Sequence, residues 1–168
     1  LIDPAVLRPG RLDVKIRVER PDASGSADIL SKYLASSIPL HPELVAKAGS
    51  ADQAAASLRA HIVEQIFSRE DSKRYVTMHF GDGSTQDLYW SDFVSGAMLA
   101  NIVDRAKTAA IKDALKSEAG QPSGLTLQHV SDAVAEEARD NEDLPDTTNP
   151  SEWARIYGHT NKRDRKST

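Results

Sequence analysis

The sequence contains no cysteine among its 168 residues. This absence excludes disulfide bonds, zinc sites with cysteine ligands and a cysteine nucleophile. No apolar run approaches the roughly 20 residues that a membrane-spanning helix needs, and no secretory signal is visible. Charge of one sign is not in excess either. The formal net charge of −4 gives no reason to expect nucleic-acid binding.

Aromatic residues are scarce as well, at 5% of the chain. Hydrophobic residues still make up 39%, so a core is expected that consists mainly of Leu, Ile, Val and Ala. The length suits one domain or one and a half. We expect the chain to be cut from a longer protein, because it opens at Leu1 without a lead-in.

The N-terminal third predicts a loop, a strand and two helices. Prolines and a glycine over residues 3–12 indicate a loop, and apolar residues alternate with charged ones over 14–19 as in a strand. Asp22 is placed to cap the first helix, and Ser50 with Gln53 fits a capping box for the second. The apolar stripes of these helices are Ile29, Leu30, Tyr33 and Leu34, then Leu58, Ile62, Val63, Ile66 and Phe67.

Residues 74–90 alternate with period two around a Gly-Asp-Gly turn, which predicts a β-hairpin. An even loop would place Val76 opposite Tyr89. We favour a three-residue loop over 81–83, with Gly83 in the left-handed conformation, which places Val76 opposite Leu88.

A long helix is predicted from about Gly96 to Lys116, and Thr126 should cap the helix after it. One side of the long helix carries Leu99, Ile102, Val103, Ala106, Ala110 and Ala114. The acidic run 136–146 is interpreted as a solvated end of the last helix. The five histidines are scattered without metal-ligand spacing, so we predict no metal site.

The segment with the clearest chemistry is 3–13, which reads DPAVLRPGRLD. Arg8 and Arg11 stand three apart around a Pro-Gly turn, which can hold two guanidinium groups in one direction. Guanidinium groups donate bidentate hydrogen bonds to phosphate oxygens. The spacing alone is also compatible with two ordinary surface arginines.

The whole segment resembles the second region of homology of AAA ATPases, over eleven consecutive residues. The resemblance implies that Arg8 and Arg11 are arginine fingers that reach the ATP site of a neighbouring subunit. Ser95, Gly96 and Ala97 are similar to the Ser-Gly-Ala of the family's nucleotide lid, and Ile29 and Tyr33 align with lid positions that line the base. Without the arginine motif, Ser95 could simply cap a helix.

Within the family, the chain is most similar to the actinobacterial proteasome-associated ATPases. This likeness is carried by residues 11–16, the hairpin before residues 93–98, and residues 101–107 and 141–150. It implies a cytoplasmic homohexamer that unfolds ubiquitin-like-tagged proteins for the 20S proteasome core, using ATP and Mg²⁺ bound mainly by upstream residues. The chain lacks Walker A and B segments, so the chain alone should not hydrolyse ATP.

The chain departs from the family at its end, which reads Lys166-Ser167-Thr168 instead of the proteasome-docking Gln-Tyr-Leu. Proteasome engagement therefore stays open. Two alternatives also stay open: a non-catalytic assembly module, and a different AAA unfoldase of the eukaryotic proteasomal or Cdc48-like type.

The expected architecture is α/β. Residues 1–21 would end the large ATPase domain with the arginine-finger loop and last strand. Residues 22–146 would form a mainly helical lid with the inserted hairpin, and residues 147–168 a tail.

Overall fold

The computed structural model describes residues 19–79, 83–118 and 121–141. The arginine motif 3–13, nearly all of the expected strand 14–19 and the expected tail 147–168 lie outside the described residues. The helices are α1 (Ala23–Tyr33), α2 (Pro42–Ala48), α3 (Ala51–Phe67), α4 (Gly96–Lys116) and α5 (Leu127–Asp140). The strands are β1 (Arg74–His79) and β2 (Thr85–Tyr89), and short 3₁₀ turns span Asp71–Lys73 and Trp90–Asp92.

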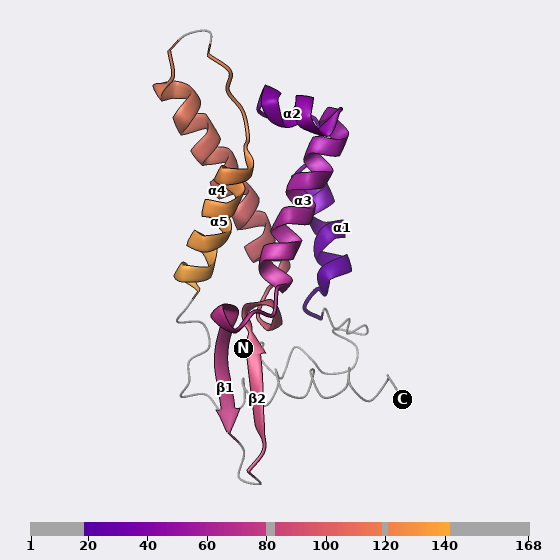
Figure 1. Ribbon diagram of the computed structural model, residues 1–168, viewed down its shortest axis with the longest axis vertical. Helices are drawn as coiled ribbons and strands as arrows, with labels where there is room; N and C mark the ends of the chain where they lie inside the picture. Colours follow the sequence, from indigo (N-terminus) through magenta and orange to yellow (C-terminus); the bar gives the residue numbers. More distant parts are fainter. Residues whose placement is uncertain (1–18, 80–82, 119–120, 142–168) are drawn as a thin grey trace, which may run out of the picture.

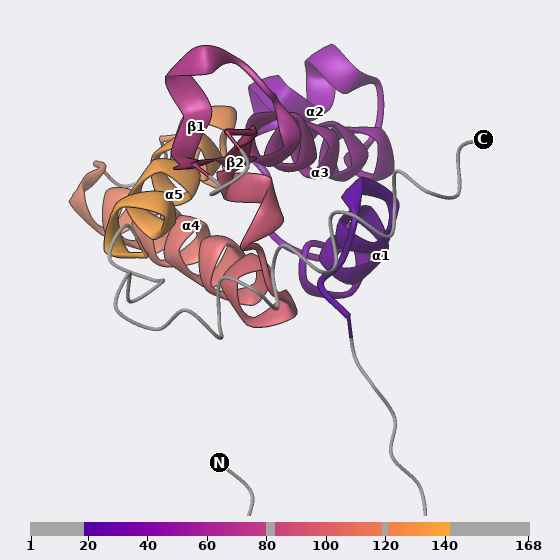
Figure 2. The same ribbon diagram turned by 90° about the horizontal axis from the view of Figure 1, so that it is seen from below.

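Four helices form a bundle, and the hairpin projects from one end of it (Figure 1). In this bundle α3 contacts α1 and α5, while α4 contacts α1 and α5, and α2 lies across the opposite end against α3. The view along the bundle shows α1 beside one end of α4 (Figure 2). The mainly helical body with a two-stranded antiparallel hairpin is the architecture that the sequence predicts for this part of the chain.

Side-chain caps begin the helices where the sequence predicts them. The side chains of Asp22, Ser50, Ser95 and Thr126 accept backbone N–H groups at the starts of α1, α3, α4 and α5. Each cap satisfies an N–H group that the helix itself leaves without a partner, which fixes the first residue of the helix. The predicted bounds of α4, from Gly96 to Lys116, are confirmed.

The core lies between α1, α3, α4 and α5, and its fully buried residues include Leu58, Ile62, Leu99, Ile102 and Val103. Ala114, which helix periodicity places on the same side of α4, is exposed. Helix α4 has 21 residues and its neighbour α5 has 14. The last turns of α4 therefore run past the core, and the side chains of Ile111 and Leu115 are 60% and 81% exposed.

The hairpin has the predicted register, with Val76 opposite Leu88 and Gly83 at φ +85°. Its base is anchored to the bundle. Leu88 is fully buried, and the ring of Tyr75 packs on that of Phe93 at 5.1 Å between centroids. The hairpin is thus held at its base, and its two strands extend away from the bundle (Figure 1).

A short parallel bridge between Leu40 and Leu125 was not predicted. Leu125 N–H donates to Pro39 O at 2.9 Å, and His41 N–H donates to Leu125 O at 3.0 Å. Gly124 makes this approach possible. A Cβ there would lie 2.6 Å from the carbonyl carbon of Leu40, and the φ of +137° also favours glycine.

Candidate functional site

The candidate site lies where α1 passes the N-terminal end of α4. Ser95 caps α4, with its Oγ accepting the Met98 N–H at 3.3 Å. Gly96 is the first residue of the helix and Ala97 is exposed. The partial positive charge at a helix N-terminus favours a nearby negative group.

The structure brings Ile29 of α1 next to Gly96 of α4. Ile29 Cδ1 would lie 3.9 Å from a Cβ built on Gly96, which is ordinary van der Waals contact. Tyr33 stands one turn after Ile29, and its side chain is 43% exposed. Because residues i and i+4 share a helix face, Ile29 and Tyr33 lie on one face of α1, and Ile29 brings this face to Gly96.

Among the described residues, no contact explains why position 96 is a glycine. Its φ is not positive, and an added methyl group would meet only the flexible end of Ile29 at a comfortable distance. Glycine is also a poorer helix former than alanine. A bare Cα next to an isoleucine and an exposed tyrosine instead suits the close approach of a flat, partly apolar ligand from outside.

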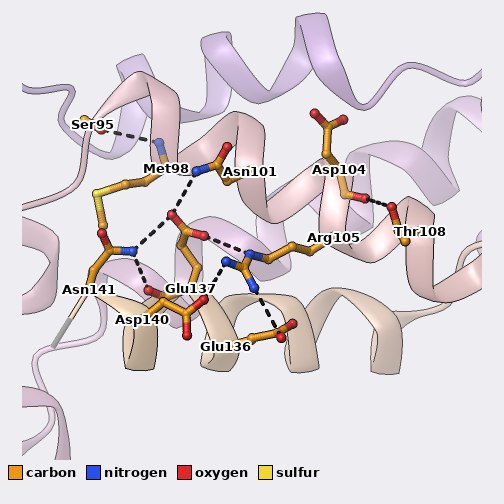
Figure 3. Close-up of polar contacts among 10 residues, drawn as sticks. All are labelled: Ser95, Met98, Asn101, Asp104, Arg105, Thr108, Glu136, Glu137, Asp140 and Asn141. Atoms are coloured by element: carbon orange, nitrogen blue, oxygen red, sulfur yellow. Dashed lines mark hydrogen bonds and ion pairs between the residues drawn. The ribbon is translucent and has the colours of Figure 1, made fainter.

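A buried carboxylate braces this end of α4 against α5 (Figure 3). The side chain of Glu137 is only 2% exposed. Its Oε2 accepts Arg105 Nε at 3.0 Å, and its Oε1 accepts Asn101 Nδ2 at 3.3 Å and Asn141 Nδ2 at 3.1 Å. Asn101 and Arg105 stand one turn apart on α4, so one face of the helix holds both oxygens of the carboxylate.

Arg105 also binds two exposed carboxylates of α5. Its Nη2 donates to Asp140 Oδ2 at 2.6 Å, and its Nη1 lies 3.2 Å from Glu136 Oε1. The hydrogen bond to Asp140 is the main reason that the pKa of Arg105 is raised. The interpretation of this acidic stretch as solvated is therefore wrong for Glu137. The signal that was missed is the Asn101–Arg105 pair, which offers donors on the face of α4 that packs on α5.

The brace extends to the hairpin. The hydroxyl of Tyr75 donates to the Asn141 carbonyl at 2.7 Å, and Met98 points toward Asn141 in Figure 3. The end of α5, the base of the hairpin and the first turns of α4 are thus fastened to one another. A ligand at Gly96 would meet a rigid helix end.

The other predicted site residues, Arg8 and Arg11, lie outside the described residues. Within residues 19–79, 83–118 and 121–141, no three His, Asp or Glu side chains gather in a way that could hold a metal ion. No helix in the same ranges is long and apolar enough to span a bilayer.

The model of the family described as "ARC, AAA+ ATPase lid domain" matches residues 21–166. Among curated relatives, a protein named "AAA ATPase forming ring-shaped complexes" from Corynebacterium jeikeium is 64% identical over 97% of this chain and 32% of its own length. A protein of the same name from Corynebacterium urealyticum is 58% identical over 97% of this chain and 31% of its own length. A "Proteasome-associated ATPase" from Saccharomonospora viridis is 50% identical over 97% of this chain and 27% of its own length. The chain thus spans about a third or less of these relatives.

Proposed function

Because the chain belongs to the ARC family of AAA+ ATPase lid domains, we propose that it is the C-terminal part of a ring-forming ATPase and that its lid covers the base of bound ATP. The observation that carries this proposal is the position of Ile29 beside the bare Cα of Gly96. The exposed Ala97 and Tyr33 widen the same surface.

The chemistry of this surface fits a nucleotide base. The flat ring would lie against Ile29 and Gly96, with Tyr33 at its margin. The positive end of the α4 dipole favours a ligand that carries negative charge. Mg²⁺ and the phosphates would be held mainly by residues upstream of this chain.

Catalysis would be shared between two subunits. We assign Arg8 and Arg11 of one subunit to the ATP of its neighbour, where they would stabilise the charge that develops on the transferred phosphoryl group. Because the sequence contains no Walker A or B segment, the chain alone should neither turn over ATP nor hold its phosphates.

The names of the relatives point to the role of the whole protein. Two of them form ring-shaped complexes and one is associated with the proteasome. We propose a cytoplasmic homohexamer that unfolds proteins carrying a ubiquitin-like tag and delivers them to the 20S core. The same proposal divides the chain into the end of the large ATPase domain at residues 1–21, the lid at 22–146 and a tail at 147–168.

The arginine fingers are tested in the full-length assembled protein with Arg8→Ala and Arg11→Ala made separately. Each change should lower kcat by about 10³-fold, the lower range for such fingers. Nucleotide affinity should stay within about threefold, because each finger acts on the neighbour's ATP and binding is carried by other residues. Arg139→Ala, an exposed position on α5, is the matched control and should retain turnover. Turnover that survives both finger changes would refute the assignment.

A further inference from the structure

Arg20 stands at the entrance to the lid and reaches across it. Pro21 follows directly, so the backbone of Arg20 is held extended. The guanidinium Nη1 donates to the carbonyl oxygen of Phe93, which is 73 positions away in the sequence. Phe93 is only two residues before Ser95, the cap of α4.

The acceptor of this hydrogen bond is firmly held. Phe93 is 7% exposed, its N–H donates to Trp90 O at 2.9 Å, and its ring packs on that of Tyr75. Val94, between Phe93 and the cap, is fully buried. The hydrogen bond therefore joins Arg20, which leads into α1, to a backbone carbonyl that its own contacts hold in place.

The segment from Arg20 to Ile29 thus meets the start of α4 at two places. One is the polar contact between Arg20 and Phe93, and the other is the apolar contact between Ile29 and Gly96. A cation near a helix N-terminus is unfavourable for the helix dipole. The guanidinium of Arg20 is therefore not there to stabilise α4. Its position is explained if it holds the segment that leads into α1.

We propose that Arg20 is a positioning residue for the nucleotide site. Its guanidinium fixes the angle at which the chain enters the lid from the upstream ATPase part, and so holds the head of α4 over the nucleotide. This inference rests on the proposed nucleotide-lid function. It adds that the lid's orientation, and not only its fold, depends on the charge-assisted hydrogen bond between Arg20 and Phe93.

The test uses two variants of the full-length assembled protein. Arg20→Met keeps the apolar stem and removes every hydrogen-bond donor of the side chain, whereas Arg20→Lys keeps a cationic donor group. Arg59→Met is the matched control. Arg59 of α3 also donates to a backbone carbonyl, that of Leu34 at 2.8 Å, but at the C-terminal end of α1, the opposite end from Arg20. The measurements are KM and kcat for ATP, Kd for a fluorescent ADP analogue, and Tm.

Arg20→Met should raise KM and Kd about fivefold with kcat kept within about twofold, because loss of uniform binding raises KM alone. Arg20→Lys should restore most of the affinity. Arg59→Met should lower Tm and leave KM within about twofold. An unchanged KM in Arg20→Met would overturn the inference, and so would an equal rise of KM in Arg59→Met. In either case the proposed function still stands if the wild-type protein hydrolyses ATP. A wild-type protein that neither binds nor hydrolyses ATP would refute the proposed function itself.

Discussion

The two ends of α4 lie in different surroundings, although one continuous helix joins them. At the N-terminal end, Leu99, Ile102 and Val103 are fully buried, and Asn101 and Arg105 hold the buried carboxylate of Glu137. At the C-terminal end, Ile111 and Leu115 are mostly exposed, and the described contact with α5 is between Asp113 and His129, at 3.0 Å. The end that carries Gly96 is therefore the fixed one, which suits the nucleotide site that we propose there.

The contrast also separates two kinds of polar contact. Glu137 is buried, so it depends on its partners, since an unpaired buried charge is strongly destabilising. Asp113 is 61% exposed and can be solvated when its partner is lost. Changes at the two ends of the same helix should accordingly differ in size.

The largest effect is expected from Arg105→Ala. It leaves the carboxylate of Glu137 buried without its cationic partner, which should lower the free energy of unfolding by about 3–5 kcal/mol. Urea unfolding of the purified chain measures the loss, with Arg139→Ala on the exposed face of α5 as the control. A loss below about 1 kcal/mol would show that Arg105 does not hold this end of α4.

A smaller effect is expected from serine substitutions at the two ends of α4. Ser95→Ala removes the N-cap of α4 and should lower the free energy of unfolding by about 1 kcal/mol. The hydroxyl of Ser117, by contrast, donates to Asp113 O on the exposed surface. Ser117→Ala should therefore change the free energy of unfolding by no more than about 0.5 kcal/mol. Equal losses by denaturant unfolding would contradict the contrast between the ends.

The smallest effect is a pH dependence at the exposed end. Thr126 N–H donates to His129 Nδ1, which leaves Nε2 to donate to Asp113, and this hydrogen bond lowers the pKa of Asp113 below its ordinary value of 3.8. A lowered folded-state pKa stabilises the fold above the ordinary pKa, and the contribution is lost as the pH falls through the lowered one. Unfolding followed from about pH 6 to about pH 3 should therefore show a shallower acid loss in Asp113→Asn. If stability fell equally steeply with pH in Asp113→Asn and in the wild type, the hydrogen bond between Asp113 and His129 would not contribute to stability.

Local features of the fold could be predicted from the sequence. The predicted caps at Asp22, Ser50 and Thr126 and the hairpin register are confirmed, because each depends on residues close in the chain. The resemblance to the AAA ATPases and to their proteasome-associated group is also confirmed.

Features that depend on distant contacts could not be predicted. The Leu40–Leu125 bridge joins segments with no shared pattern, and the burial of Glu137 depends on donors of another helix. The exposure of Ala114 could not be predicted either, because periodicity gives the face of a helix but not where its neighbours end. At the candidate site, the sequence named Ile29 and Gly96 and the structure brings them together. The roles of these two residues, and those of Arg8 and Arg11, stay predictions.

We propose that Gly96 is a glycine because a nucleotide base lies against it, and not because the fold requires a glycine there. This proposal is tested by Gly96→Ala in the full-length assembled protein, with Kd for ATP and Tm measured on the same preparation. A Cβ meets no obstacle in the lid, and alanine favours the helix, so Tm should be unchanged or higher. Affinity for ATP should nevertheless fall about tenfold, because the methyl group would displace the base. An affinity equal to that of the wild type would contradict the account.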